Sequence, residues 1–335
     1  FPILNSKSQP IAKNNNIFFS DDDGTIYCIE ENGKIKWKRN VYKKLYKQIY
    51  KKLTFSIYGN NIFVADNIGF VYAINIDNGE IFWIKNFYIP FKSHIKIFDK
   101  KIYLLDQDNK ILCLDVKDGT KLWDILSVQS FIKTQNFLSV AISKEGDFVT
   151  VNSASDLIKV NGKTGDIYWS SNISNTALAT ETDFFESSEL VLLNNTVFVA
   201  STQSTYSYKL ENGYLNWETE VGCTGTPIID KKNLFCVTKN GFFVILNIIT
   251  GEIVSSTNIL NVLKEKKRDT YIIGYIMGSD KIYSVTNNGF LIISSAKTGK
   301  VEEFKKLGDT IISPPIVVNN KLFILTKKSK ILGFN

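Results

Sequence analysis

The chain has 335 residues, of which 44% are hydrophobic and 13% aromatic, and its formal net charge is +7. No apolar run approaches the ~18 residues of a membrane-spanning helix, which argues against a helical membrane protein. The positive charge comes from scattered lysines rather than from a dense arginine patch, so we expect no nucleic-acid partner.

A strand–turn–strand unit recurs from one end of the chain to the other. In its clearest copy, an apolar run from Val71 to Ile76 is followed by Asp77-Asn78-Gly79 and by a second apolar run with Trp83. Asn-Gly suits a tight hairpin because glycine adopts a positive φ at little steric cost. The turn glycines recur at Gly33, Gly79, Gly119, Gly165, Gly213, Gly251 and Gly299. All five tryptophans lie four residues after such a glycine, at Trp37, Trp83, Trp123, Trp169 and Trp217.

Each unit contains a second turn signal and further strands upstream of this hairpin. The second turn is marked by Gly24, Gly69, Asn109, Ser155, Ser204, Gly241, Gly289 and Ser329. Four short strands per unit and a period of about 44 residues predict an all-β fold, an eight-bladed β-propeller of four-stranded antiparallel blades. Because each blade of such an array packs only on its neighbours, we predict a single domain over residues 1–335.

Residues 41–53 interrupt the pattern between the first and second units. Tyr42, Leu45, Tyr46, Ile49, Tyr50 and Leu53 recur at three- and four-residue steps, with lysines between them. This periodicity predicts a helical insertion over residues 41–53. Its apolar stripe either packs on the propeller or belongs to a basic amphipathic element that touches an anionic membrane surface.

Two long connections between later units carry apolar and charged side chains. The first includes Phe131, Ile132 and Lys133, and the second includes Asp183, Phe184, Phe185 and Glu186. Apolar side chains in long loops on a rigid scaffold are candidates for a partner-binding surface. The alternative for each loop is packing against the blades.

The last unit ends after three strand signals, and a short apolar segment precedes the first unit. We expect residues 1–5 to close the ring as the missing outer strand of the last blade, which would remove the sheet edges of an open array. The alternative is a frayed N-terminus.

The cysteines and the histidine favour structural roles over catalysis. Cys28 and Cys113 hold the same repeat position and are expected in the core, whereas Cys223 and Cys236 fall within one unit and their disulfide state is left open. With His94 as the only histidine, neither a Ser-His-Asp triad nor a multi-histidine metal site can be built. We therefore expect no catalytic residue, no metal and no cofactor.

The units resemble the repeat of the pyrroloquinoline-quinone-type propellers, written loosely as Ala-x-Asp-x-x-Thr-Gly-x-x-x-Trp. The best copies are residues 73–79 with Trp83, residues 114–119 with Trp123, and residues 163–165 with Trp169. Within that superfamily, the quinoprotein dehydrogenases are much longer and use a vicinal cysteine pair and calcium, and no two cysteines here are adjacent. The chain is more similar to the BamB-type outer-membrane assembly lipoproteins, which have eight blades and no cofactor. Residues 226–230 and Arg268-Asp269 are similar to the alphaproteobacterial versions of that family.

This resemblance implies a non-enzymatic scaffold at the inner face of the outer membrane, in the periplasm. Its partners would be the periplasmic domains of the barrel-inserting outer-membrane subunit and unfolded outer-membrane proteins. By position, the family's partner-binding loops correspond to Phe131, Ile132 and Lys133, and to Asp183 and Glu186. The family's lipidated cysteine is not in this chain, so we expect that it was removed upstream with the signal or that the protein is anchored differently.

Two other interpretations stay open at this point. A PQQ-dependent or sugar-linked dehydrogenase of the quinoprotein type would show a cofactor spectrum, or a carboxylate-lined central pocket beside a metal. A general interaction propeller in another compartment would start without a leader. The sequence does not decide which loop face would dock a partner.

Overall fold

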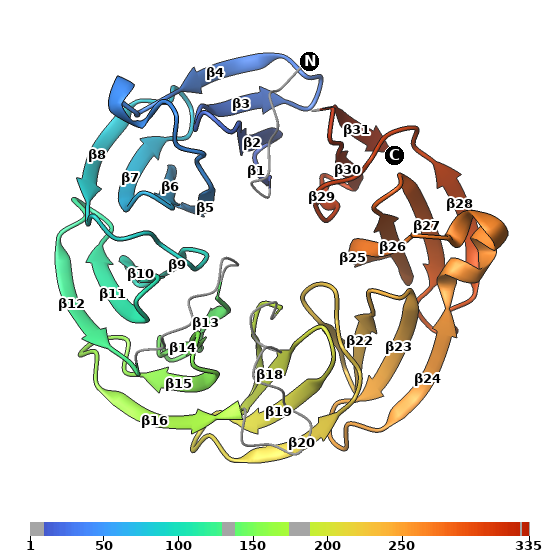
Figure 1. Ribbon diagram of the computed structural model, residues 1–335. Helices are drawn as coiled ribbons and strands as arrows, with labels where there is room; N and C mark the ends of the chain where they lie inside the picture. The colour runs from blue at the N-terminus through green and yellow to red at the C-terminus, as the bar shows by residue number, and fades with distance from the viewer. Residues whose placement is uncertain (1–9, 129–137, 174–187, 329, 335) are drawn as a thin grey trace. The chain divides into compact units, whose positions relative to one another are not determined.

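The computed structural model describes residues 10–128, 138–173, 188–328 and 330–334. The chain divides into two compact units. Within the described residues, the N-terminal unit ends at residue 173 and the C-terminal unit begins at residue 188. Both are built from short antiparallel sheets, shown in Figure 1. In the described part of the chain, no helix has the length and apolar composition that crossing a bilayer requires.

The N-terminal unit holds four blades, and each is a four-stranded sheet with its strands in sequence order. The first two blades are β1 (Ile11–Lys13), β2 (Asn16–Ser20), β3 (Ile26–Glu30) and β4 (Ile35–Arg39), then β5 (Leu53–Tyr58), β6 (Asn61–Asp66), β7 (Phe70–Asn75) and β8 (Ile81–Asn86). The next two are β9 (Lys96–Phe98), β10 (Lys101–Leu105), β11 (Lys110–Asp115) and β12 (Lys121–Leu126), then β13 (Val140–Ile142), β14 (Phe148–Val151), β15 (Asp156–Val160) and β16 (Ile167–Asn172). In Figure 1 the fourth strand of each blade lies on the convex side of the unit.

The C-terminal unit holds three four-stranded blades and one three-stranded sheet. Its first two blades are β17 (Val191–Leu193), β18 (Thr196–Ala200), β19 (Thr205–Lys209) and β20 (Leu215–Thr219), then β21 (Ile228–Asp230), β22 (Asn233–Val237), β23 (Phe242–Asn247) and β24 (Ile253–Asn258). After the 3₁₀-helical segment η4 (Ile259–Lys267) come β25 (Ile272–Gly278), β26 (Lys281–Thr286), β27 (Phe290–Ser295) and β28 (Val301–Lys306), and finally β29 (Ile316–Val318), β30 (Lys321–Leu325) and β31 (Ile331–Phe334).

These sheets confirm the predicted all-β fold, an eight-bladed propeller with four-stranded antiparallel blades. The last sheet has three strands in the described residues. The strand predicted at residues 1–5 to complete it lies outside the described residues, as does Ser329. The assignment of residues 1–335 to one domain stays a prediction.

The second turn of each unit is held by a polar side chain at the end of the second strand. In the second blade, Oδ1 of Asp66 accepts hydrogen bonds of 2.8 to 2.9 Å from the backbone N–H groups of Ile68, Gly69 and Phe70. Gly69 has φ +107°, and a Cβ there would lie 2.8 to 2.9 Å from backbone atoms of the following connection. The glycine at this turn therefore lets the backbone of the following connection approach closely.

Each tryptophan stands at a β-bulge between the third and fourth strands of its blade. Trp37 is paired with Cys28, and the register shifts immediately after that pair. A bulge bends the strand and redirects the side chain. The indole Nε1 of Trp37 donates a 3.0 Å hydrogen bond to the carbonyl oxygen of Ile76 in the next blade. The same bond joins Trp83 to Val116, Trp123 to Gly162, and Trp217 to Ile248, and Trp169 occupies the same bulge opposite Lys159.

The hairpin glycines receive these indole rings. A Cβ on Gly79 would lie 2.8 Å from ring carbons of Trp37, and one on Gly119 would lie 2.6 Å from Trp83. Glycine is needed at these turns for its positive φ and also because the preceding blade's indole covers it. The tryptophan and the glycine of the repeat are therefore two halves of one contact between consecutive blades.

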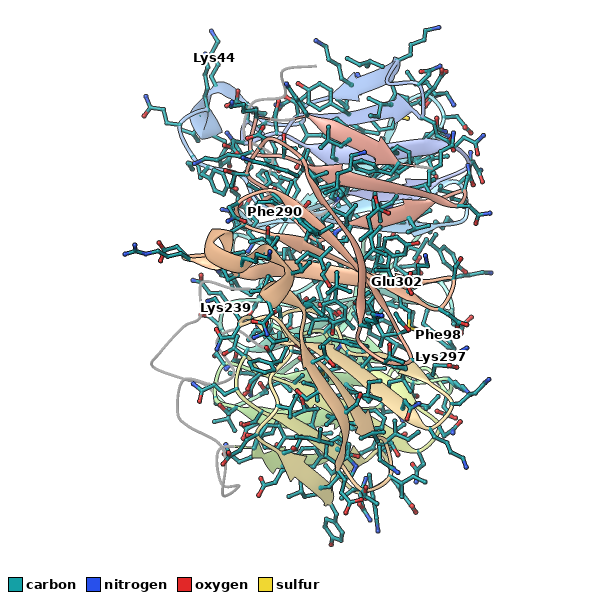
Figure 2. The ribbon with its side chains drawn as sticks, turned by 90° about the vertical axis from the view of Figure 1, so that its right-hand side faces the viewer. Lys44, Phe98, Lys239, Phe290, Lys297 and Glu302 are labelled. Carbon is teal, nitrogen blue, oxygen red and sulfur yellow. A yellow bond between two sulfur atoms is a disulfide. The ribbon has the colours of Figure 1, made fainter. Side chains whose placement is uncertain are left out.

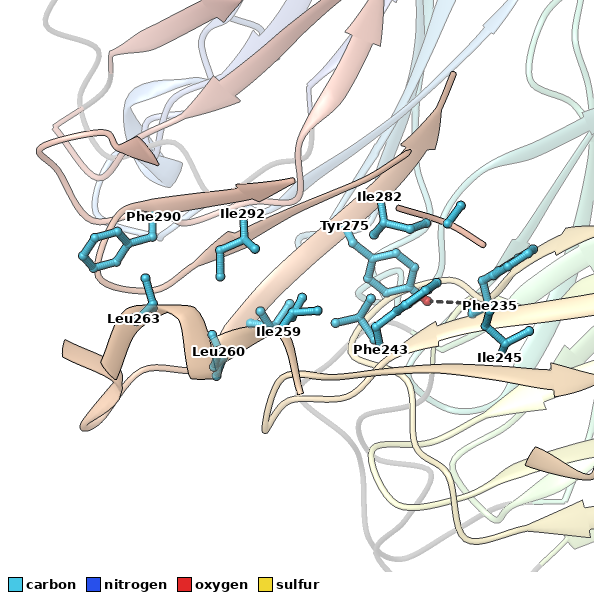
Figure 3. Close-up of a cluster of buried hydrophobic side chains, with 13 residues drawn as sticks. Phe235, Phe243, Ile245, Ile259, Leu260, Leu263, Tyr275, Ile282, Phe290 and Ile292 are labelled. Carbon is cyan, nitrogen blue, oxygen red and sulfur yellow. Dashed lines mark hydrogen bonds between the residues drawn. The ribbon is translucent and has the colours of Figure 1, made fainter. Parts of the chain in front are cut away.

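Apolar side chains on facing strands fill the space between neighbouring blades. In the C-terminal unit, Ile259, Leu260 and Leu263 of η4 are buried in one cluster with Phe290 and Ile292 of β27. Figure 3 shows this cluster, in which the short helical segment covers the sheet. Here an inter-blade connection contributes to the core.

Residues 41–53 do not form the predicted helix. They contain one 3₁₀ turn, η1 (Lys44–Tyr46), and β5 already begins at Leu53. Besides the local bonds of this turn, backbone groups bond outside the segment: the Lys52 N–H donates to Oδ1 of Asn67 at 2.7 Å. An isolated helix of about 12 residues is marginal in water, so such contacts with neighbouring turns decide the conformation.

The apolar stripe predicted for this segment is split between two environments. Tyr42 turns inward, where its hydroxyl donates to Oδ2 of Asp66 at 2.5 Å, and Tyr46 packs edge-on against Phe70 with ring centroids 5.4 Å apart. Leu45, in contrast, is 82% exposed. Periodicity alone could not separate these two groups.

Candidate docking surface

In the N-terminal unit, the described parts of the inter-blade connections lie at one end of the blades, together with the second turns. Three backbone hydrogen bonds show this arrangement: Lys51 to Asp22, Phe87 to Gly69, and Ser127 to Asn109. We call this end the connection face. It contains the second turns of the four blades, residues 40–52 and 87–95, and the described ends of the connection from 127 to 139. Long loops on such a face are held by a rigid scaffold, as binding loops commonly are.

The connection that carries Phe131, Ile132 and Lys133 leaves the third blade through a buried polar network. Oγ of Ser127 donates to the Asn109 carbonyl at 2.8 Å, and Nδ2 of Asn109 donates to the Val128 carbonyl at 2.9 Å. Oδ1 of Asn109 accepts from the backbone N–H and the hydroxyl of Ser153 in the next blade, at 3.1 and 2.8 Å. A satisfied network of this kind has high rigidity in a low-dielectric interior. The loop therefore starts from a fixed point.

The other end of the same connection is fixed as well. Leu138 is buried, its N–H donates to the Lys92 carbonyl, and it forms a parallel bridge with Ser93. Oγ of Ser93, which is fully buried, accepts from the Leu105 N–H at 2.9 Å. Burial lowers the pKa of the Lys92 amine beside this anchor.

The five predicted partner-binding residues, Phe131, Ile132, Lys133, Asp183 and Glu186, lie outside the described residues. The structure describes the anchors of both connections. In the N-terminal unit the Ile173 N–H donates to the Ser155 carbonyl at 2.8 Å, and in the C-terminal unit the Ser188 N–H donates to the Ala200 carbonyl at 2.8 Å.

Exposed apolar side chains accompany these anchors on the connection face. Leu45 is 82% exposed, Tyr88 is 83% exposed with φ +63°, and Val128 is 61% exposed. Large exposed apolar side chains on one face indicate an interaction surface more strongly than scattered ones do. The connection face therefore exposes one large apolar side chain in each of three connections, and exposed apolar side chains such as Phe82 and Leu122 also lie on the outer strands.

The remaining chemistry-bearing residues have structural positions. Nδ1 of His94 lies 3.1 Å from Oγ1 of Thr54, within hydrogen-bonding distance. Cys28 and Cys113 are buried, and burial raises the pKa of each thiol to about 12. Among the described residues, no three His, Cys, Asp or Glu side chains gather as a metal site would require.

Cys223 and Cys236 form a disulfide with their Cα atoms 5.1 Å apart. Cys223 lies in the connection before β21, and Cys236 lies in β22, so the bond ties this connection to its blade. The pairing answers the question that the sequence left open.

The polar anchors were missed by the sequence reasoning. A signal was present, because Asn109 stands where other units have glycine, and its φ of +62° needs a residue that tolerates the left-handed region. Its side-chain amide bonds to residues of two blades, and these long-range contacts are visible only in the structure.

Comparisons with known proteins agree with this architecture. A sequence profile of the outer membrane protein assembly factor BamB family matches residues 4–83 and 22–257. The curated BamB of Yersinia pestis is 20% identical over 244 residues, which cover 70% of this chain and 62% of that protein, less than two thirds of its length.

Two solved structures show the similarity of fold. The crystal structure of BamB from Moraxella catarrhalis superposes with a TM-score of 0.78 at 13% identity, over 99% of this chain and 97% of that chain. A europium-containing methanol dehydrogenase superposes with a TM-score of 0.71 at 11% identity, over 97% of this chain and 83% of that chain. At such identities the superpositions show a shared fold only, whereas the sequence profile covers most of the chain. The chain belongs to the family of the outer membrane protein assembly factor BamB.

Proposed function

We propose that the protein is a non-enzymatic scaffold of outer-membrane protein assembly, which docks a barrel-inserting outer-membrane subunit through its inter-blade loops. Membership of the BamB family supports the role in assembly. The observation that carries the docking site is the pair of rigid anchors, at Ser127 and Leu138, of the connection that holds Phe131, Ile132 and Lys133. Unfolded outer-membrane proteins are the second proposed class of ligand.

In the proposed mechanism, the rigid blades hold the binding loops in place for the partner. Ordering a loop on binding costs affinity, and fixing both of its ends reduces that cost. Phe131 and Ile132 would supply apolar contact area and Lys133 a positive charge, and Asp183 and Glu186 would offer negative charge on the later connection. The partner surface would then have to be apolar at its centre and carry charges of both signs.

We propose the periplasm as the compartment, with the protein at the inner face of the outer membrane and held there by a lipid anchor. The Cys223–Cys236 disulfide supports this proposal, because structural disulfides persist in oxidising compartments such as the periplasm.

The docking site is tested by a binding titration with the periplasmic domains of the barrel-inserting subunit. The Phe131→Ala/Ile132→Ala variant is expected to weaken binding by roughly 2 kcal/mol or more, as apolar anchors at interface centres do. The matched control is Phe82→Ala/Ile84→Ala, because these residues are a Phe and an Ile exposed on the outer strand β8. Equal affinities for the two double variants would refute the proposed site.

A second pair of variants tests the proposed role of the acidic residues Asp183 and Glu186. Asp183→Ala/Glu186→Ala should reduce binding in a salt-dependent way, whereas Glu211→Ala/Asp230→Ala removes the same charges from exposed positions of the C-terminal unit and should not. Identical salt dependence in both variants would remove Asp183 and Glu186 from the site.

The dehydrogenase interpretation rests on the fold shared with the methanol dehydrogenase. It predicts that the purified protein, incubated with pyrroloquinoline quinone and calcium, retains the quinone after gel filtration and shows its absorbance. The scaffold proposal predicts no retained absorbance.

A further inference from the structure

The connection between the first and second blades projects from the connection face as a basic segment with an apolar tip. At its turn, η1, Leu45 is 82% exposed, and Ile49 and Tyr50 are also exposed nearby. Figure 2 shows Lys44 directed away from the ribbon at this projection. We call residues 43–50 the basic projection.

Its charges are of one sign. Lys43, Lys44 and Lys47 are exposed, and within the described chain none of the recorded ion pairs involves them. Their ammonium groups are therefore available to an anionic ligand.

A cleft of about 240 Å³ opens at the base of the projection. Its lining includes Lys43, Lys44, Lys47 and Lys51, with Asp23 as the one carboxylate. The Lys51 ammonium lies 5.5 Å from the ring centroid of Tyr42 and donates to the Lys47 carbonyl at 3.4 Å. The cleft is therefore lined mainly by positive charge and is large enough to admit a small anionic group.

The backbone on both sides of the projection is fixed, so its tip is held outward. Tyr42 is tied to Asp66, and the Lys51 N–H donates to the Asp22 carbonyl at 3.2 Å. The neighbouring Tyr46 packs edge-on against Phe70, which fixes this side of the turn. The exposure of Leu45 is therefore a property of the folded connection.

We propose that the basic projection binds the surface of an anionic phospholipid bilayer, with Leu45 inserted at the interface and the lysines on the headgroups. An exposed leucine among lysines suits an interface, where apolar insertion and attraction to anionic lipid act together. A purely acidic peptide would use the lysines, but it offers no apolar group to cover Leu45. The proposal goes beyond docking of the assembly subunit and does not depend on residues 131–133.

The test is flotation of the full chain with vesicles of phosphatidylcholine alone and with vesicles in which about a third of the lipid is phosphatidylglycerol. Binding is expected only to the anionic vesicles and should weaken as salt rises from about 0.05 M to about 0.5 M. Each lysine near such a surface contributes roughly fivefold to partitioning, so Lys44→Gln/Lys47→Gln should lower the partition coefficient about 30-fold at low salt. Leu45→Ser should lower it about tenfold.

Matched controls are available on the same unit. Lys117→Gln/Lys163→Gln removes two exposed lysines from hairpin turns at the opposite end of the blades, and Leu122→Ser changes an exposed leucine of β12. Both controls should bind anionic vesicles as the unaltered protein does. Thermal unfolding of every variant checks that the fold is retained.

Three results would overturn the proposal. The first is equal binding to neutral and anionic vesicles, and the second is an equal loss in the two lysine double variants. The third is binding of a poly-glutamate peptide that depends on Lys44 and Lys47 while no vesicle binds, which would assign the projection to an acidic partner. If Lys44→Gln/Lys47→Gln and Leu45→Ser lose vesicle binding but still bind the barrel-inserting domains as the unaltered protein does, the result supports the proposal and does not affect the docking site.

Discussion

The indole nitrogen of Trp37 and the carbonyl oxygen of Ile76 are 3.0 Å apart and join two consecutive blades by a buried hydrogen bond. The ring of the same tryptophan covers Gly79, three residues further along the second blade. Trp37, Trp83, Trp123 and Trp217 each make this contact with the following blade, so the repeat contains a connector between these consecutive units.

Trp37→Phe keeps an aromatic ring but removes the donor to the Ile76 carbonyl, which is then buried without that partner. We expect the free energy of unfolding to fall by about 1–3 kcal/mol, and Trp37→Ala to cost about 3–5 kcal/mol through the cavity it leaves. Urea unfolding followed by circular dichroism measures both. Phe82→Ala, at an exposed position, should change stability by only about 0.5 kcal/mol. If Phe82→Ala lowered the free energy of unfolding as much as the Trp37 variants do, the buried Trp37 contact would not contribute more to stability than an exposed side chain.

Gly79→Ala and Gly59→Ala separate the two roles of a hairpin glycine. Both residues have positive φ, +71° and +57°, but a Cβ meets the Trp37 ring at 2.8 Å only in the first case, and nothing lies within 4 Å in the second. Gly59→Ala should cost about 1 kcal/mol from backbone strain alone, and Gly79→Ala should cost roughly 1–3 kcal/mol more from the contact. Melting temperatures of the two variants decide the matter. Equal shifts would show that φ is the whole requirement.

Asp66 provides a pH-dependent test of the second turn. Burial raises the pKa of this carboxyl above its ordinary value of 3.8, although its hydrogen bonds to Tyr42 and to the turn act in the opposite direction. Between the unfolded and the folded pKa the native state binds the proton more tightly, so this group's contribution to stability is present at low pH and is lost as pH rises through the folded pKa.

Asp66→Asn removes this titration and keeps an acceptor at Oδ1. The stability of the variant relative to the unaltered protein should therefore increase as pH rises from about 4 toward neutrality. Chemical denaturation of both proteins at a series of pH values gives the difference. A decrease over the same interval would mean that the folded protein favours the ionised carboxylate.

The Cys223–Cys236 disulfide should be a measurable part of stability. Its closed loop is short, and a loop of about 15 residues corresponds to roughly 3 kcal/mol in the chain-entropy account. A reducing agent should lower the melting temperature of the unaltered protein and leave that of Cys223→Ala/Cys236→Ala unchanged. Titration of thiols under denaturing conditions should find only Cys28 and Cys113 free before reduction. Four free thiols at that stage would contradict the pairing.

Short-range signals were enough to predict the repeat. The turn at Asp77-Asn78-Gly79 and the alternation on either side of it are contained in some fifteen residues, and the structure has a hairpin there, β7 to β8. The phase of the tryptophans predicted that they share one position, and the β-bulges confirm this. The pattern did not identify what each indole contacts, since the carbonyl partner lies 31 to 39 residues away in the next unit.

The sequence predicted the structure of the connection face less accurately than it predicted the repeat. Periodicity over residues 41–53 predicted a helix, but the bonds of Tyr42 to Asp66 and of Lys52 to Asn67 draw the chain onto turns of the second blade. The anchors at Asn109 and Leu138 likewise depend on contacts between blades. Phe131, Ile132, Lys133, Asp183 and Glu186 remain predictions from the family resemblance.

The sequence by itself determined the number and order of the blades, because strands and tight turns depend on alternation and on φ preferences within a few residues. Only the tertiary structure decided which connections are anchored, where the disulfide forms and which face of residues 43–50 is exposed. Those outcomes are set by hydrogen bonds and packing between segments distant in sequence, and these contacts outweigh the weak local preference of a short irregular connection.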